Sequence, residues 1–265
     1  MNIVVCVKPV PDPEKYNLLR IDDKTKSLVR EGVPTIVNPA DKNALELALK
    51  LKALHGGKVA VVSMCPLFSQ DRIKVCLAMG ADEGYIVSDR AFGGADTFST
   101  SYTLAKGIEK LEFKADLILT GQESADGATS QVSSQLGEWL ELPHLANITE
   151  IETDGKQARM KKKTPDGFIE YEVELPAVAA VARGSNKPRM MTAAGIVKIR
   201  NKPLQVFTKA DLDVDDSLIG LSGSQTKAGS LIAPEMNRES KPIEGNITQV
   251  AQQILDIIKK TGIAV

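Results

Sequence analysis

The fold of this chain is decided by the stretch Gly121-Gln122-Glu123-Ser124-Ala125-Asp126-Gly127-Ala128-Thr129-Ser130-Gln131-Val132. It follows an apolar run at 115–120 that is typical of a buried strand. It opens a segment whose apolar residues, Val132, Leu136, Trp139 and Leu140, have the spacing of one helix face. A turn from strand into helix directs free N–H groups and the positive end of the helix dipole at one spot, which favours phosphate binding. Thr129, Ser130 and Gln131 add side-chain donors. An ordinary loop with a polar helix cap is the alternative.

Strand and helix patterns alternate around this stretch. Apolar runs without polar alternation lie at 2–8, 58–65, 115–121 and 177–182, as expected of strands covered on both faces. Helical patterns lie between them at 41–55, 69–79 and 96–111. This order predicts the α/β class, with a parallel sheet and right-handed crossovers.

Two regions depart from the alternation. Residues 148–174 alternate polar and apolar around the hairpin signals Asp154-Gly155 and Asp166-Gly167, which predicts an antiparallel excursion that returns at 175–176. Residues 213–245 are rich in Gly, Ser, Pro, Asp and Lys, and an amphipathic helix at 247–260 follows them. A structureless stretch of that length is unusual inside a compact domain, which slightly favours packing of this helix on a partner subunit over its own domain.

Composition limits the functional class. The chain has 265 residues, 43% hydrophobic and 25% charged, and a net charge of −1. These values indicate a cytoplasmic protein that binds neither nucleic acid nor a membrane, and residues 1–9 resemble a strand more than a signal peptide. Three scattered cysteines, Cys6, Cys65 and Cys76, are expected to be reduced and to serve in packing.

Common catalytic motifs are absent from the sequence. No GxGxxG follows the first strand, and the chain contains no GxxxxGK[ST], no metal-ligand spacing and no nucleophile elbow. A chain that binds a nucleotide without these groups is expected to be a carrier or binding subunit, with neither a catalytic side chain nor a metal.

Several segments together point to one family. They are Val5-Cys6-Val7-Lys8-Pro9-Val10-Pro11-Asp12, Arg30-Glu31-Gly32-Val33-Pro34, Asn38-Pro39-Ala40-Asp41, Leu77-Ala78-Met79-Gly80-Ala81-Asp82, Asp89-Arg90-Ala91-Phe92-Gly93-Gly94-Ala95-Asp96-Thr97 and the 121–132 stretch. In this order they resemble the beta subunit of electron transfer flavoproteins, over residues 1 to about 210. Residues 213–265 carry no sharp motif of that family.

The resemblance implies a parallel-sheet adenine nucleotide alpha hydrolase-like domain at 1–212, with the hairpin insertion at 146–176. An extended arm and helix at 213–265 would contact the alpha subunit of a heterodimer. Many members hold a structural AMP in this domain, whereas the electron-bifurcating branch holds FAD. The adenine and ribose would lie near Cys6, Asn38, Pro39, Ala40, Asp41 and Met64, and the phosphates on Gly121 to Val132.

A second segment bears on the choice of cofactor. Gly94-Ala95-Asp96-Thr97 resembles the GADT signature of the FAD-binding branch, and Asp96 is also a good helix cap. Helix starts at 96 and near 127 would flank the carboxyl ends of neighbouring strands, which suits an elongated ligand such as FAD. Asp126 is expected to cap the helix or to order its loop rather than to contact phosphate through its carboxylate, because like charges repel.

The resemblance implies that, in the bifurcating branch, NADH gives a hydride to the FAD of the beta subunit. One electron then goes to ferredoxin and the other, through the alpha-subunit FAD, to a dehydrogenase. The family's docking loop carries Asn-x-Pro-Arg-Tyr and a Leu, whereas here Met190 follows Asn186-Lys187-Pro188-Arg189 and Ala193 falls at the Leu position. Loss of these anchors favours a lactate dehydrogenase partner over an acyl-CoA or enoyl-CoA dehydrogenase. Open alternatives are an AMP-holding beta subunit, a stand-alone nucleotide-binding module and an ATP pyrophosphatase, whose SGGxD-like loop is missing.

Overall fold

The computed structural model of the chain describes residues 1–18, 20–21, 28–29, 32–199, 202–227, 229 and 240–262, and only the backbone of 20–21 and 28–29. Internal contacts divide the chain into two units, residues 1–229 and 230–265. The first unit holds the sheet, and the second holds the last described helix. Arg30 and Glu31 of the family-like segments lie outside the described residues.

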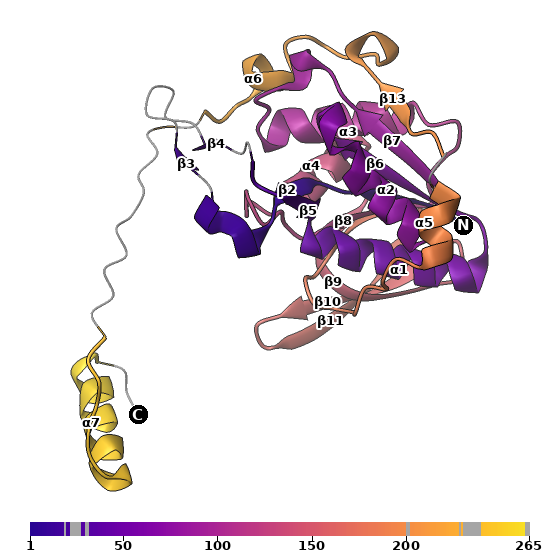
Figure 1. The fold of residues 1–265 in the computed structure, drawn as a ribbon. Helices are drawn as coiled ribbons and strands as arrows, with labels where there is room; N and C mark the ends of the chain where they lie inside the picture. Colours follow the sequence, from indigo (N-terminus) through magenta and orange to yellow (C-terminus); the bar gives the residue numbers. More distant parts are fainter. Residues whose placement is uncertain are drawn as a thin grey trace. The chain divides into compact units, whose positions relative to one another are not determined.

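A nine-stranded sheet forms the centre of the first unit (Figure 1). Its strands are, in spatial order, β11 (Gly167–Glu174), β10 (Gln157–Thr164), β9 (His144–Thr153), β12 (Ala177–Val181), β8 (Leu117–Gly121), β1 (Asn2–Cys6), β6 (Lys58–Met64), β7 (Glu83–Val87) and β13 (Gln205–Phe207). Neighbours from β9 to β13 are parallel, whereas β10 is antiparallel to both β9 and β11. The predicted α/β class, parallel sheet and antiparallel excursion are therefore confirmed.

Helices cover both faces of the sheet (Figure 1). They are α1 (Pro39–His55), α2 (Gln70–Met79) and α5 (Ala193–Ile199) on one face, and α3 (Thr97–Glu109) and α4 (Val132–Trp139) on the other. Ile3 and Val5 of β1 pack in the cluster that contains residues of α1 and α2. Val4 and Cys6 pack in the opposite cluster, with residues of α3 and α4. Burial on both sides explains why the strand runs lack polar alternation.

Short elements complete the first unit. β2 (Pro9–Pro11) pairs with β5 (Thr35–Val37), and β3 (Arg20–Ile21) pairs with β4 (Leu28–Val29). Short helical segments are η1 (Pro13–Leu18), η2 (Leu67–Ser69), η3 (Arg90–Phe92), η4 (Lys209–Asp211) and α6 (Gly220–Gly223).

The start of the region expected to be an arm packs on the first unit. Ile219 is buried in the cluster on the α3 face, and Leu218 packs against it. The N–H of Asp215 donates to the hydroxyl of Tyr102, a residue of α3, at 2.8 Å. The apolar side chains involved, Val214, Leu218 and Ile219, have no periodic spacing, so the sequence pattern does not predict these contacts.

Helix α7 (Ile247–Lys260) of the second unit occupies the predicted range. Asn246 caps it in a reciprocal pair with Gln249, which satisfies two N–H groups of the first turn. Its apolar residues Ile247, Ile254 and Ile257 are exposed. The helix is therefore amphipathic, as its sequence pattern predicts.

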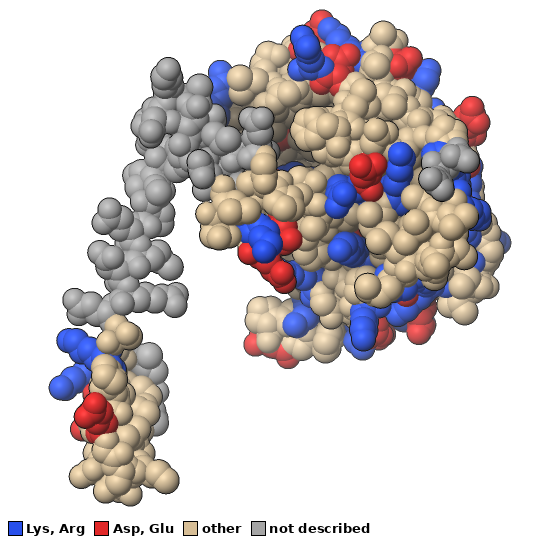
Figure 2. All heavy atoms as spheres, viewed as in Figure 1, with Lys and Arg blue, Asp and Glu red and all other residues tan. Residues whose placement is uncertain are grey.

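The surface carries charges of both signs. Figure 2 shows lysine and arginine interspersed with aspartate and glutamate on the visible face of the first unit, in keeping with the net charge of −1. Of the helices in the described ranges, none is both long and apolar enough to cross a membrane.

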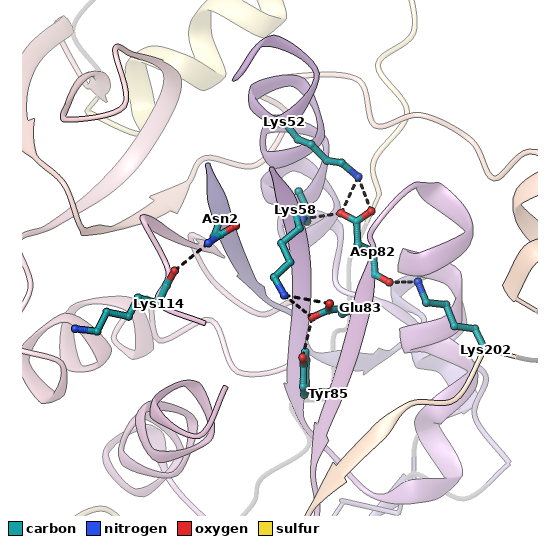
Figure 3. A network of polar contacts seen from close by, with 9 residues as sticks. Asn2, Lys52, Lys58, Asp82, Glu83, Tyr85, Lys114 and Lys202 are labelled. Atoms are coloured by element: carbon teal, nitrogen blue, oxygen red, sulfur yellow. Dashed lines mark hydrogen bonds and ion pairs between the residues drawn. The ribbon is translucent and has the colours of Figure 1, made fainter. Parts of the chain in front are cut away.

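A polar network joins the starts of the strands, and Asp82 is its centre (Figure 3). Both carboxylate oxygens of Asp82 accept from Lys52 at 2.6 Å, and one also accepts from the N–H of Val59 at 2.8 Å. Lys202 donates to the Asp82 carbonyl. One side chain thus ties the end of α1 to the start of β6, which gives the Asp82 of the Leu77–Asp82 segment a structural role.

Replacing Asp82 therefore tests the network. Asp82→Ala leaves Lys52 and the Val59 N–H without their acceptor, and we expect a loss of about 1–2 kcal/mol in the free energy of unfolding. Glu172→Ala, which breaks an exposed 3.7 Å pair with Arg159, should change it by less than about 0.5 kcal/mol. Urea denaturation of both variants measures the difference, and equal losses would contradict the assigned role.

Candidate functional site

The loop after β8 is irregular up to Gln131. The N–H groups of Gly127 and Ala128 both point to the carbonyl of Ser124, at 3.3 and 2.8 Å, which makes a tight turn. Ala128 and Ser130 have φ of 49° and 55°, in the left-handed region. Helix α4 begins at Val132. The helix start expected near 127 is therefore wrong, because left-handed residues cannot continue a right-handed helix.

Strained loop backbone is common where a loop binds a ligand. Thr129, Ser130 and Gln131, the side chains proposed as donors, are all exposed at the end of this loop. The hydroxyl of Ser130 donates to Glu123 at 3.0 Å, and the N–H of Gln122 donates to the carbonyl of Val181 at 2.9 Å. The loop is thus fixed at its start and exposes polar groups at its end.

Asp41, in the first turn of α1, holds the ends of two strands together. Its carboxylate accepts from the N–H of Lys8, just after β1, at 2.7 Å and from the N–H of Gly121, at the end of β8, at 3.1 Å. A Cβ at position 121 would lie 2.3 Å from the Asp41 Oδ1. Only glycine permits this approach, so Gly121 is explained by packing against Asp41.

Asn38 extends the same contact to the loop. Its side-chain N–H group donates to Asp41 at 2.8 Å and to the carbonyl of Glu123 at 2.8 Å, and its oxygen accepts from the N–H of Ala125 at 3.1 Å. Asn38 is buried. Sequence reasoning placed Asn38 and Asp41 beside an adenosine, and the structure brings both to the loop, where their polar atoms bond to the protein itself.

Sequence reasoning missed the cation of this site, Lys8. Its ammonium group lies 2.6 Å from an Asp126 carboxylate oxygen and 3.3 Å from the Ser124 hydroxyl. The Lys8 side chain is 48% exposed, whereas the Asp126 side chain is 6% exposed. Asp126 therefore orders its loop, as expected. The available signal was a lysine placed directly after the first strand, at the edge where such sheets bind ligands.

The second predicted segment caps α3. Asp96 accepts from the N–H of Ser99 at 3.0 Å and, through its other oxygen, from the N–H and hydroxyl of Thr226, both at 2.8 Å. Burial raises the pKa of Asp96, but these hydrogen bonds outweigh it and hold the pKa below its usual value. The hydroxyl of Ser224 accepts from the Asp96 N–H at 2.9 Å. Asp96 thus caps α3 and also binds residues 224 and 226.

The two predicted segments meet at one contact. The Thr97 hydroxyl donates to the side-chain carbonyl of Gln131 at 3.0 Å. Behind it, Trp139 of α4 packs edge-on against Phe98 and Tyr102 of α3, with centroid distances of 5.2 and 5.0 Å. The strands that precede these helices, β7 and β8, are separated by β1 and β6. The expectation of neighbouring strands is therefore wrong, and helix packing brings the segments together instead.

The other proposed residues lie on the same strand-end side. Cys6 ends β1, Met64 ends β6, and Pro39 and Ala40 begin α1, while Gly94 precedes α3. Burial and then the Asp41 charge raise the pKa of the Cys6 thiol to about 12. The thiol therefore stays protonated and packs as an apolar group. All three cysteines are free and buried.

The side-chain hydroxyls of two serines in the first turns of α3 and α4 are buried and have no hydrogen-bond partner. They are Ser99, fully buried in the first turn of α3, and Ser133, 3% exposed in the first turn of α4. Buried hydroxyls usually find an acceptor or a water. Lys8 and the exposed hydroxyls of Thr129 and Ser130 lie at the same strand-end side. Within the described residues, no group of His, Cys, Asp and Glu could hold a metal ion.

This geometry is that of an α/β protein with a donor-rich site at the carboxyl ends of its strands. The profile of the electron transfer flavoprotein domain matches residues 25–212. The electron transfer flavoprotein subunit beta of Thermoanaerobacterium thermosaccharolyticum is 40% identical over 257 residues, 97% of each chain. The caffeyl-CoA reductase-Etf complex subunit CarD of Acetobacterium woodii is 39% identical over 265 residues, 99% of this chain and 100% of its own. The acryloyl-CoA reductase electron transfer subunit gamma of Anaerotignum propionicum is 34% identical over 262 residues, 97% of each chain.

The chain therefore belongs to the electron transfer flavoprotein family, as a beta subunit. The resemblance read from the sequence segments is confirmed. The matches to the relatives extend over nearly the full length of the chain, including residues 213–265, where the sequence carried no sharp motif.

Asp41 gives the site a testable pH dependence. Burial raises its pKa from 3.8 to about 7, against the lowering effect of hydrogen bonds from Asn38, Lys8 and Gly121. Between about pH 4 and 7 the folded protein therefore holds a proton that the unfolded chain releases. The stability contributed by this proton is complete below about pH 4 and is lost as the pH rises to about 7.

We expect the free energy of unfolding of the wild type to fall between pH 5 and pH 8, relative to Asp41→Asn, on the order of 2 kcal/mol. Denaturant titrations at the two pH values measure it. Asp96→Asn is the control, because a lowered pKa contributes no change above pH 5. Parallel pH profiles for the wild type and Asp41→Asn would show that Asp41 does not titrate in this range.

Proposed function

We propose that the chain is the FAD-binding beta subunit of a heterodimeric, electron-bifurcating electron transfer flavoprotein in the cytoplasm. It accepts a hydride from NADH, and its electrons pass to ferredoxin and, through the alpha subunit, to a partner dehydrogenase. Under this proposal the first unit is an adenine nucleotide alpha hydrolase-like domain, and residues 213–265 include the arm that contacts the alpha subunit. The amphipathic sequence of α7 and the unusual length of the polar stretch before it support that contact.

One observation carries the proposal. The Thr97–Gln131 contact joins the α3 start to the end of the 121–131 loop, at 3.0 Å. The contact brings the predicted donors of the 121–131 loop and the start of α3 side by side. An elongated ligand with a pyrophosphate and a ring system, such as FAD, could use both segments. The GADT-like segment 94–97 favours the same cofactor over AMP.

Under this proposal the residues of this chain bind and orient the cofactor. The Lys8 ammonium group supplies the positive charge that a pyrophosphate requires, and Asp41 and Asn38 fix the loop that carries the hydroxyl donors. Bound FAD would supply the hydride acceptance and the single-electron transfers. No side chain of the site needs to act as an acid or base, because the redox chemistry belongs to the cofactor.

The partner dehydrogenase has two candidates. Two relatives carry names that place them in caffeyl-CoA and acryloyl-CoA reductase complexes, which supports an acyl-CoA or enoyl-CoA type partner. Met190 and Ala193, at the positions where the docking loop usually carries its anchors, support a lactate dehydrogenase instead. A beta subunit that holds structural AMP is the second candidate function, and under it Asp41 and Asp96 serve only the internal contacts described above.

Lys8 provides the test of this site. In the heterodimer with the alpha subunit, we expect Lys8→Gln to weaken nucleotide retention about tenfold, because the phosphate loses a charge-assisted contact. Lys156→Gln, in a hairpin turn of the excursion, removes the same charge and should retain nucleotide fully. Dialysis followed by quantification of the bound nucleotide measures retention.

Anaerobic titration with NADH provides the functional reading of the same samples. Wild type and Lys156→Gln should show bleaching of flavin absorbance, and Lys8→Gln should show bleaching in proportion to its remaining flavin. Full retention in Lys8→Gln would remove Lys8 from the site. A fully loaded wild type that NADH does not bleach would contradict the role of NADH as donor.

A further inference from the structure

Residues 220–226, which include α6, pack against the turn that precedes α3, and we call them the latch. The N–H of Leu221 donates to the carbonyl of Gly93 at 3.0 Å. A Cβ on Gly220 would clash with the carbonyl oxygen of Ala91, so only glycine permits this approach. The latch therefore lies directly beside the segment that opens α3.

Ser224 joins the latch to the residue that caps α3. Its hydroxyl accepts from the N–H of Asp96 at 2.9 Å and donates to the carbonyl of Gly220 at 2.8 Å. Ser224 is 7% exposed. This buried hydroxyl thus ties the backbone at the start of α3 to the backbone of α6.

The Asp96 carboxylate is shared between the helix and the latch. One oxygen accepts from the N–H of Ser99, within α3, at 3.0 Å. The other accepts from both the N–H and the hydroxyl of Thr226, each at 2.8 Å. Hydrogen bonds to a charged acceptor are stronger than those between neutral groups, so these contacts fix the orientation of the carboxylate.

That orientation matters because the next residue belongs to the proposed cofactor site. Thr97 donates to Gln131, at the end of the 121–131 loop. The hydrogen bonds that lower the pKa of Asp96 keep its carboxylate ionised at neutral pH. A pyrophosphate is also anionic, and like charges repel. A carboxylate that turned from the latch toward such a ligand would therefore oppose its binding.

We propose that Thr226 is a positioning residue of the proposed cofactor site and acts through Asp96. By binding the second carboxylate oxygen, it directs this negative charge to the latch and away from the phosphates of the ligand. Ligand binding and closure of the latch then favour each other by the same factor. The inference rests on the proposed function in that an anionic nucleotide binds beside Thr97. It makes cofactor retention depend on the chain just before the second unit, which begins at residue 230.

The alternative is direct binding of the cofactor by the Asp96 carboxylate. In that arrangement the carboxylate exchanges Thr226 for the ligand, so the cofactor opens the latch. The two accounts therefore predict changes of opposite sign in the protection of the latch from hydrogen exchange.

Amide hydrogen exchange of the 219–227 peptide distinguishes them in the heterodimer with the alpha subunit. We expect FAD, added to protein depleted of nucleotide by dialysis, to slow exchange of this peptide about tenfold. Bound FAD is quantified in the same sample. The 152–158 peptide, at a hairpin turn of the excursion, is the internal control and should not change. Exchange of 219–227 that is unchanged or faster with FAD bound would overturn the inference.

Variants of the latch test the reciprocal effect on the cofactor. Thr226→Val removes one donor to Asp96, and we expect FAD retention by this subunit to fall about tenfold. Thr226→Ser keeps the hydroxyl and should restore retention. Ser222→Ala is the matched control, because it removes a latch hydroxyl that donates to the carbonyl of Ile219 at 3.2 Å. Equal retention in Thr226→Val and Ser222→Ala, or no rescue by serine, would contradict the role of Thr226.

The two proposals fail separately. AMP in place of FAD in this subunit would remove the proposed function, and the exchange experiment is then run with AMP. Slower exchange of 219–227 with AMP would support the latch, whereas unchanged exchange would overturn it. Full binding of FAD with no change in exchange or in the retention of Thr226→Val would overturn the latch and leave the cofactor assignment intact.

Discussion

The buried carboxylate of Asp41 is the contact on which the site depends. Three N–H donors from three segments converge on it: the backbone of Lys8, the backbone of Gly121 and the side chain of Asn38. Burying an ionisable group is costly unless hydrogen bonds satisfy it, and here every donor comes from the protein. The carboxyl ends of β1 and β8 are therefore held together before any ligand arrives, and Gly121 must lack a side chain so that Asp41 can reach it.

Helix α1 carries this constraint to two separate loops. Its first turn fixes the loop that follows β8, through Asn38 and Asp41, and the next two turns fix residues 184–191, through Asn43 and Glu46. These four polar side chains are buried on a helix whose other buried residues are aliphatic. One rigid element thus orders both the proposed cofactor loop and residues 184–191.

The sequence predicts the architecture better than the site. Strands such as β1 and β6 are continuous apolar runs and are predictable, whereas β7 begins with Glu83, whose side chain pairs with Lys58, and so shows no such run. The sequence predicts the start of α4 near residue 127, because Asp126-Gly127 has the composition of a helix start. The helix begins at Val132, because Ala128 and Ser130 adopt left-handed backbone that the sequence does not predict. The family resemblance predicts Asp41 as a ligand contact, whereas its burial and its internal donors emerge only from the fold. Lys8 is missed because its partner, Asp126, is more than a hundred residues away in the chain.

The central claim is that this subunit holds a flavin at the strand ends, and quantification of released cofactors tests it most directly. The chain would be co-expressed with its alpha subunit, the heterodimer purified, and the cofactors released and separated by chromatography. The account predicts two FAD per heterodimer and no AMP. One FAD with one AMP would contradict it, and would leave the site as a structural nucleotide holder with electron transfer confined to the partner subunit.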